Sequence, residues 1–278
     1  QSRVAPYSFT TVSVIPGMMV YKNARIQILD VPGLIEGAEE GKGRGREVLS
    51  VARGADLIIL MTDVQRPEAI ERIEAALERN GIRLDIVRPN VIIDKKVSGG
   101  ITLRSNIKQD LSKDTIKSVI QELGIKNSEV TINEKLTLDK LIDAFSPNRV
   151  YVPSISIINK SDMLDKDKKM KLKDYVTYND ICYISAEKDI GLEELKEKMW
   201  EILGFVNVYL VRPDKQPSFE NPVVMKRGQT LSDVTQAIGT EFSEGKTRAK
   251  IWGTGAKFSG QEVSLSTEVQ EGMQVRFI

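Results

Sequence analysis

Short apolar runs alternate with stretches of helical periodicity through the first two thirds of the chain. Apolar residues dominate Asp56–Val64, Val152–Asn159 and Asp180–Ser185, a pattern typical of parallel strands that are covered on both faces. Apolar residues recur every three to four positions in Glu68–Asn80 and Gly191–Leu203, which predicts two amphipathic helices. Strands that alternate with helices in this way predict an α/β domain built on a parallel sheet.

The stretch 95–149 interrupts this alternation and has signals of its own. They are a turn at Gly99-Gly100, a β-like run near Ile101, a helix near Thr115–Leu123, a strand near Val130 and a helix near Leu138–Phe145. We interpret 95–149 as a small inserted α+β domain. The α/β domain then consists of residues 1–94 and 150–203, and it includes two more predicted strands around Lys22-Asn23 in Gly17–Asp30.

Residues 204–278 show a third pattern, in which short strands are separated by glycine-containing turns. The predicted strands are Val206–Arg212, Ala249–Trp252, Glu262–Leu265 and Met273–Ile278. Thr230 followed by Asp233 matches a capping box and predicts a short helix. One helix among about four short strands favours a compact β-grasp, ubiquitin-like domain.

Composition narrows the chemistry. The chain has no histidine, which excludes histidine triads and histidine metal ligands, and its one cysteine, Cys182, cannot form an internal disulfide. The net charge is +1 for the chain and +1 for 204–278, and neither value indicates nucleic-acid binding. The stretch 95–149 carries +3. No apolar run approaches the roughly 20 residues of a membrane span. We therefore expect a cytoplasmic protein without a membrane partner.

Asp30, Val31, Pro32 and Gly33 directly follow a predicted strand. A carboxylate at such a strand end can hold Mg²⁺ through water, and the glycine lets a backbone N–H approach a terminal phosphate closely. By itself this pattern is weak, because ordinary turns have it too. A hydroxyl on the preceding loop, at Thr10 or Thr11, can ligate Mg²⁺, although threonines are also common in β-rich loops.

Asn159, Lys160, Ser161 and Asp162 follow another predicted strand. The Asp162 carboxylate matches the N1–H and N2–H₂ donors of guanine, a donor pair that adenine lacks, and charge-assisted bonds of this kind contribute roughly 1.5–3 kcal/mol each. Asn159 can tie neighbouring loops together, and the aliphatic stem of Lys160 can cover the base. A simple turn is the alternative.

Ser185, Ala186 and Glu187 follow the third strand of this type, 23 positions after Asp162. Their expected role is to donate backbone N–H groups to guanine O6. The tripeptide alone is nearly uninformative, and its position after a strand gives it value. Ligand sites in open α/β sheets lie at the carboxyl ends of the strands, so the motifs together predict a guanine-nucleotide site.

The phosphate loop G-x-x-x-x-G-K-[ST] does not occur in the 278 residues. The glycine-rich segment Gly37–Gly45 imitates it, but its first spacing is one residue short and Lys42 is followed by Gly43. It also comes after Asp30–Gly33 rather than before. We interpret it as part of a mobile loop.

These residues together resemble the Obg-related GTPases, most closely the branch of developmentally regulated GTP-binding (DRG) proteins. The resemblance rests on YSFTT at Tyr7–Thr11, DVPGLIEGAEEGKGRGREVLSVAR at Asp30–Arg53, NRVYVPSISIINKSD at Asn148–Asp162, SAE at Ser185–Glu187 and WGT at Trp252–Thr254. It covers nearly the whole chain.

The resemblance implies a P-loop-type GTPase domain, an insertion like a ribosomal-protein domain, and a C-terminal TGS domain. It implies slow GTP hydrolysis to GDP with Mg²⁺, often stimulated by K⁺, association with ribosomes, and a small stabilising regulatory protein. Thr11 matches the Mg²⁺ ligand of the family, Asp30 holds the ion through water, and Phe9 and Thr10 belong to the same nucleotide-binding segment. An N-terminal helical segment and a phosphate loop are also implied ahead of Gln1.

Leu34 follows Gly33, where Ras-like enzymes place a glutamine that orients water. Leucine cannot do this, so the catalytic group stays open and slow turnover is expected. Two functions remain in competition. The first is a GTPase that switches on the translation machinery, for which the chain without its phosphate loop would be inactive. The second is a ribosome- or RNA-binding module in which nucleotide is incidental.

Overall fold

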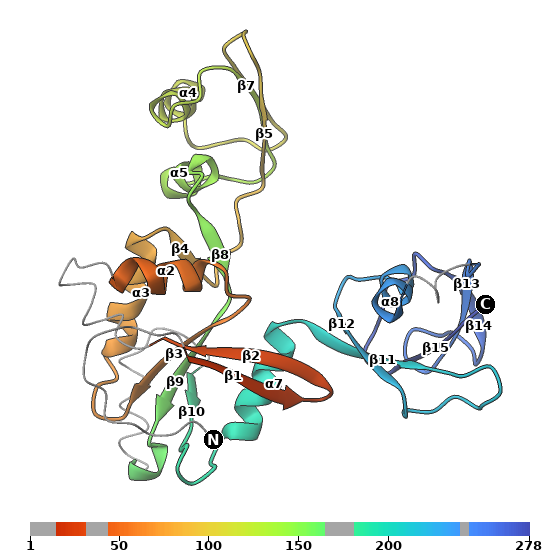
Figure 1. The fold of residues 1–278 in the computed structure, drawn as a ribbon. Coiled ribbons are helices and arrows are strands. Elements are labelled where there is room, and N and C mark those ends of the chain that lie inside the picture. Colours follow the sequence, from red (N-terminus) through yellow and green to blue (C-terminus); the bar gives the residue numbers. More distant parts are fainter. Residues whose placement is uncertain (1–14, 32–43, 165–180, 240–244) are drawn as a thin grey trace.

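The computed structural model describes residues 15–31, 44–164, 181–239 and 245–278. Figure 1 shows them as three lobes: one around β3, β9 and β10, one containing α4 and α5, and one containing α8 near the C-terminus. Each of these lobes has a sheet of its own, and the division of the chain into domains stays a prediction.

The first lobe contains a parallel sheet of order β10-β9-β3, with a separate antiparallel hairpin beside it. Its strands are β1 (Ile15–Tyr21), β2 (Ala24–Asp30), β3 (Ile58–Asp63), β9 (Ser154–Asn159) and β10 (Ile181–Tyr183). Its helices are α2 (Arg44–Arg53), α3 (Ala69–Arg79) and α7 (Leu192–Ile202). The strands and helices predicted for this part are confirmed, with ends shifted by a few residues.

Alternate residues of β9 serve the two faces of the parallel sheet. Ile155 and Ile157 pack with α7 and the hairpin, whereas Ile158 packs with α3. This alternation is why the strand reads as an uninterrupted apolar run in the sequence. The helices therefore cover the sheet from both sides.

The insertion leaves and re-enters the first lobe through two short strands that pair in parallel, β4 (Ile82–Leu84) and β8 (Val150–Val152). Its own sheet has the order β5-β7-β6. Its elements are β5 (Val91–Lys95), β6 (Ile101–Ser105), α4 (Lys113–Glu122), β7 (Ser128–Ile132) and α5 (Leu138–Phe145). The predictions for β6, α4, β7 and α5 are confirmed.

Strand β5 was not predicted. It pairs antiparallel with β7, so this sheet takes in residues ahead of the predicted boundary at 94/95. Val91 and Ile93 pack against the core of the insertion while Ile92 is exposed, a half-covered alternation too short to stand out from the flanking polar residues. The domain boundaries remain predictions.

A charged cluster joins the insertion to the first lobe. The carboxylate of Asp143 on α5 accepts from Arg83 Nε at 2.6 Å, Arg83 Nη2 at 2.8 Å and Arg149 Nε at 2.7 Å. The three side chains are only 12–19% exposed. Arg53, at the end of α2, donates to the backbone oxygens of Asn80 and Asn148. The root of the insertion is therefore fixed by hydrogen bonds from three arginines.

The C-terminal lobe is a five-stranded sheet of order β12-β11-β15-β13-β14 with one helix. Its elements are β11 (Phe205–Leu210), β12 (Pro222–Lys226), α8 (Leu231–Ile238), β13 (Arg248–Trp252), β14 (Gln261–Ser264) and β15 (Met273–Phe277). The four predicted strands and the capping box at Thr230 and Asp233 are confirmed. The expected count of about four strands was one short, because β12 was missed.

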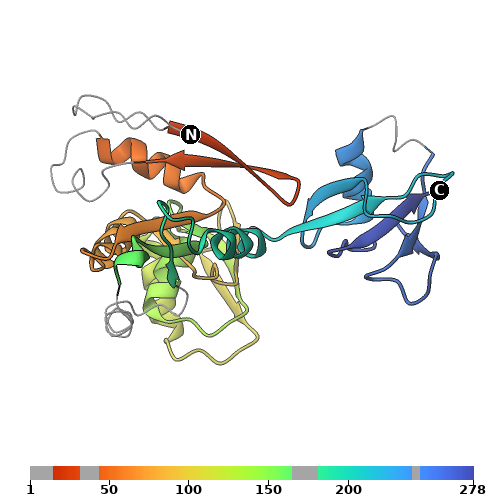
Figure 2. The same cartoon turned by 90° about the horizontal axis from the view of Figure 1, so that it is seen from below.

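The position of β12 explains why it was missed. It begins at Pro222 and lies at the edge of the sheet, where a residue without an N–H is tolerated. A proline at the start of a short segment weakens the strand signal. Figure 2 shows this lobe from below, joined to the first lobe through α7 and β11.

None of the helices in the described part of the chain has the length and apolar character needed to span a membrane.

Candidate functional site

The carboxyl ends of β3, β9 and β10 lie next to one another, because the three strands are parallel neighbours. The register places Asp63 of β3 beside Asn159 of β9, and Ile158 beside Tyr183 of β10. Asn159, Lys160 and Asp162 therefore come together with Ser185, Ala186 and Glu187 at one sheet edge, as the sequence predicts. Figure 1 shows β3, β9 and β10 side by side in the first lobe.

Asn159 ties two of the strand-end loops together. Its Oδ1 accepts hydrogen bonds from the backbone N of Lys160 at 2.8 Å and of Ala186 at 3.1 Å. The backbone N of Ser161 also donates to Ile184 O at 2.9 Å. The side chain acts as a brace between the loop after β9 and the loop after β10, which keeps both loops in fixed relative positions.

Lys160 adopts the left-handed conformation, with φ 60° and ψ 33°, and is followed by a short 3₁₀ helix, Ser161–Met163. A residue other than glycine is uncommon in this region. The turn directs Lys160 Nζ to Asp63 Oδ2 at 2.7 Å. This hydrogen bond lowers the pKa of Asp63 more than burial raises it. Asp63 therefore anchors the lysine as a carboxylate.

Asp162 is held by donors from the neighbouring loop. Its side chain is 15% exposed, and Oδ2 lies 2.8 Å from Lys188 Nζ. Hydrogen bonds from Lys188 and from the buried Ser185 hydroxyl lower its pKa. The Asp162 carboxylate is therefore held in a fixed orientation beside the carboxyl ends of the strands.

The three backbone N–H groups of the tripeptide have different partners. Ser185 N donates to Ile190 O at 3.0 Å, and Ala186 N donates to Asn159 Oδ1. Within the described residues Glu187 N has no partner, and Glu187 is exposed. Of the three predicted donors, Glu187 N is the one left available to a ligand oxygen.

The switch half of the predicted site is described only in part. Asp30 ends β2, and among the described residues its exposed side chain has no hydrogen-bond or ion-pair partner. Phe9, Thr10, Thr11, Pro32, Gly33 and Leu34 lie outside the described residues, as does most of the glycine-rich segment. The Asp30 carboxylate is a hard oxygen donor of the kind that Mg²⁺ and its bound waters prefer.

Two residues at this edge were missed by the sequence reasoning. Asp63 lies within the predicted strand Asp56–Val64 and ends the observed β3, and Lys188 directly follows the tripeptide. A polar residue at the end of a buried parallel strand is the signal that points to Asp63. No sequence signal predicts that Lys188 turns toward Asp162 rather than toward solvent.

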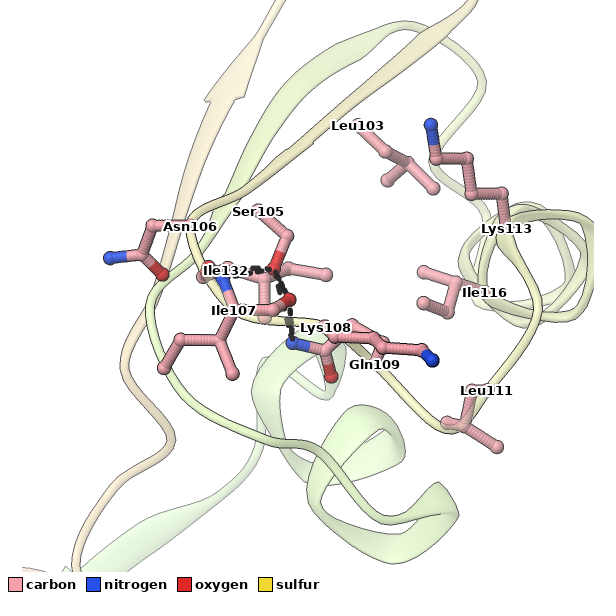
Figure 3. Close-up of a pocket in the computed structure, with 10 residues that line it drawn as sticks. All are labelled: Leu103, Ser105, Asn106, Ile107, Lys108, Gln109, Leu111, Lys113, Ile116 and Ile132. Atoms are coloured by element: carbon pink, nitrogen blue, oxygen red, sulfur yellow. Dashed lines mark hydrogen bonds between the residues drawn. The ribbon is translucent and has the colours of Figure 1, made fainter.

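A second concave feature lies in the insertion, away from these strand ends. It is a cavity of about 380 Å³ between the loop after β6 and α4 (Figure 3). Its lining includes the apolar side chains of Leu103, Leu111 and Ile116, with Lys108 and Lys113 on the same loop and helix. Ser105 and Gln109 satisfy each other and nearby backbone oxygens. The cavity thus offers apolar surface and the positive charge of Lys108 and Lys113. The side chains of Ser105 and Gln109 already have hydrogen-bond partners.

Comparison with known proteins matches the chain to three family models in succession. Residues 1–95 match a model described as 50S ribosome-binding GTPase, residues 98–205 match the C-terminal region of the same GTPase domain, and residues 206–278 match the TGS domain.

Similar proteins cover most of this chain. An uncharacterized GTP-binding protein of Methanocaldococcus jannaschii is 41% identical over 98% of this chain and 70% of its own length. Developmentally-regulated GTP-binding protein 1 of Xenopus laevis is 38% identical over 94% and 71%. Developmentally-regulated GTP-binding protein 2 of Homo sapiens is 36% identical over 95% and 72%.

Among solved structures, a GTP-binding protein from Pyrococcus horikoshii matches at 15% identity with a TM-score of 0.40. The match covers 61% of this chain and 57% of that one. A likeness this weak has no bearing on the fold.

Proposed function

Since this chain belongs to the DRG family of GTP-binding proteins, with a TGS domain at its C-terminal end, we propose that it reads the guanine base and forms most of the switch of an enzyme that hydrolyses GTP to GDP and phosphate. The observation that supports this best is the low-exposure Asp162 carboxylate at the joint end of three parallel strands.

In this proposal the base is recognised by four groups. Asp162 accepts from guanine N1–H and N2–H₂, and the Glu187 N–H, which has no partner among the described residues, donates to O6. Asn159 keeps the two loops in register, and Lys160, anchored on Asp63, lays its stem along the base. Adenine would leave the Asp162 charge without its donor pair, which is a strong basis for discrimination.

The phosphate side of the proposal relies on Asp30 and on residues outside the described part, Thr11 and Gly33. Mg²⁺ bound there would neutralise charge that develops on the phosphates. Asp30 would hold the ion through water, and Thr11 would ligate it directly. No G-x-x-x-x-G-K-[ST] motif occurs in the 278 residues, so hydrolysis would need a phosphate anchor from another segment, and we expect the chain by itself to be inactive.

A substitution at Asp162 tests this proposal. Asp162→Asn removes a charge and places an amide where guanine needs an acceptor, so GTP affinity should fall by about tenfold to a hundredfold, since each charge-assisted bond is worth about 1.5–3 kcal/mol. Xanthosine triphosphate, which presents an oxygen in place of N2–H₂, should gain relative to GTP. Calorimetry on the natural full-length protein measures both.

Asp189→Asn is the matched control, because Asp189 lies in the neighbouring Ser185–Ile190 turn with φ 53° and asparagine tolerates that conformation. It should leave GTP affinity unchanged. If Asp162→Asn keeps the wild-type preference for GTP over ATP, Asp162 does not read the base and the proposal fails.

A second function, a module that binds a ribosome or RNA, is favoured by the charge of the insertion. It carries +3, and Lys108 and Lys113 line its cavity without an ion-pair partner among the described residues. Cosedimentation with ribosomes in GTP, in GDP and without nucleotide separates the two functions. Binding that ignores nucleotide supports the module, and binding that requires GTP supports a switch on translation. We also propose that a small regulatory protein binds the chain and stabilises it.

A further inference from the structure

Lys188 lies beside the carboxylate that would bind guanine. Its Nζ lies 2.8 Å from Asp162 Oδ2, on the carboxylate that the proposed function assigns to the base. The lysine side chain is 57% exposed, while that of Asp162 is 15% exposed. No other ion pair of Lys188 occurs within the described residues. A flexible cation is therefore paired with a nearly fixed anion at the point of base recognition.

The backbone under Lys188 is held tightly. Ser185 and Ile190 exchange two backbone hydrogen bonds, at 3.0 and 3.1 Å, and close the turn between them. Gly191 follows with φ 74°, and a side chain there would place its Cβ 2.5 Å from Tyr183 O, so only glycine fits. The turn fixes the backbone position of Lys188. Because the side chain of Lys188 is exposed, its ammonium group can move away from Asp162.

Guanine would meet a carboxylate that is already neutralised. The N1–H and N2–H₂ donors of guanine need lone pairs of the Asp162 carboxylate as acceptors. Lys188 Nζ already occupies one acceptor position on Oδ2. A carboxylate accepts about four hydrogen bonds, and the Ser185 hydroxyl and Lys188 fill part of that capacity before any ligand arrives.

We propose that Lys188 is a specificity-setting counterion: it pairs with Asp162 when no guanine is bound and is exchanged for the base on binding. This rests on the proposed function, since it concerns the same pocket. The Lys188–Asp162 pair stabilises the site when it is empty. Guanine nucleotides therefore bind more weakly and dissociate faster than they would if Asp162 had no counterion. The pair also shields Asp162 beside a wrong base, which softens discrimination against adenine.

Lys188→Met tests the exchange, because it removes the charge and keeps most of the aliphatic stem. GDP affinity should rise about two- to fivefold, the range that an ion pair between partly exposed side chains supplies. The gain should appear mainly as slower GDP release. The preference for GDP over ADP should widen, because adenine would then face an unpaired carboxylate. Titration and stopped-flow release on the natural full-length protein give the three values.

Two further measurements separate an exchange of charge from a change in folding. Lys188→Arg keeps the charge and should stay at or below the wild-type GDP affinity. The ratio between Lys188→Met and wild type should shrink as NaCl rises, because salt weakens the ion pair. Lys196→Met removes a lysine whose ion pair, with Glu193 at 2.6 Å on α7, involves no residue assigned to the base, and should change neither GDP affinity nor release.

The outcomes are distinguishable from a failure of the proposed function. A wild-type protein without preference for GDP over ADP would overturn both the function and the exchange. A wild-type protein with that preference, but with GDP affinity unchanged or lowered in Lys188→Met, would overturn the exchange alone.

Discussion

The insertion and the C-terminal domain are attached to the same GTPase lobe by opposite means. The insertion is held by a charged cluster, in which Arg83 and Arg149 both bind Asp143 with little exposure to solvent. The C-terminal domain is attached through apolar contact: the ring of Phe205 lies 5.3 Å from that of Trp200, and Val224 packs against the same core. Among the described residues, the one ion pair between this domain and the GTPase lobe joins Lys226 to Asp56 and is mostly exposed.

The difference shows how each junction obtains its geometry. Hydrogen bonds from two guanidinium groups to one carboxylate are directional, so the first junction specifies an orientation. Apolar contact is not directional, and at the second junction the chain itself, running from α7 through Gly204 into β11, supplies the constraint. A charged cluster of this kind is costly to break, because the partner charges stay desolvated.

Asp143→Ala should have the largest effect of the changes considered. It would leave Arg83 and Arg149 poorly hydrated and unpaired, and we expect a loss of about 2–3 kcal/mol in the free energy of unfolding, somewhat below the range for fully buried pairs. Urea denaturation measures it. Asp139→Ala on the same helix is the control, because Asp139 is exposed, and it should cost less than about 1 kcal/mol.

A cost below that of the control would mean that the cluster at the first junction does not hold the insertion. The contrast between the two junctions would then be lost.

Phe205→Ala should come next, at about 2 kcal/mol. Full burial of phenylalanine gives larger losses on truncation, but Phe205 is only partly buried. Loss of the ring also removes its contact with Trp200. Lys226→Met is the matched change at the same junction and should cost at most about 0.5 kcal/mol, because its ion pair is exposed. The comparison is contradicted if Lys226→Met proves the more damaging of the two in the same denaturation experiment.

Lowering the pH should weaken the first junction and leave the second unchanged, with a smaller effect on stability than the substitutions above. Burial alone raises the pKa of Asp143, but hydrogen bonds from Arg83 and Arg149 outweigh it and hold the pKa below its usual range. A lowered folded-state pKa contributes stability above the unfolded value, near 3.9, that is lost as pH falls through the folded value.

The stability difference between wild type and Asp143→Asn should therefore be constant from pH 7 to about 5 and vanish toward pH 2. The difference between wild type and Phe205→Ala should stay flat over the same range. Denaturation series at each pH give both curves. A flat curve for Asp143→Asn would show that the charge of Asp143 is not what stabilises the first junction.

Local patterns in the sequence were sufficient for most elements and for one half of the site. An uninterrupted apolar run predicted β9, helical periodicity predicted α7, and the capping residues predicted α8. Asn159, Asp162 and Ser185 meet because each follows a buried strand of one parallel sheet, a rule that needs no knowledge of distant contacts.

Partnerships between distant residues could not be predicted. The partner of Lys160 is Asp63, 97 positions away, and that of Arg83 is Asp143, 60 positions away. Sequence patterns show that a charge is present and not which way it turns. For the same reason the pairing of Lys188 with Asp162 was not anticipated, although both residues were within or beside recognised motifs.

The parallel pairing of β4 with β8 leaves the length of chain between them free to vary. The chain leaves β4 at Leu84 and returns at Val150 in an adjacent three-residue strand, with Ile82 paired to Val150 and Leu84 to Val152. Closing a loop costs only about 0.6 kcal/mol more for each doubling of its length. The insertion can therefore be lengthened, shortened or exchanged at little thermodynamic cost, provided that the six bracketing residues keep their pairing and that a carboxylate remains in the place of Asp143 to pair with Arg83 and Arg149.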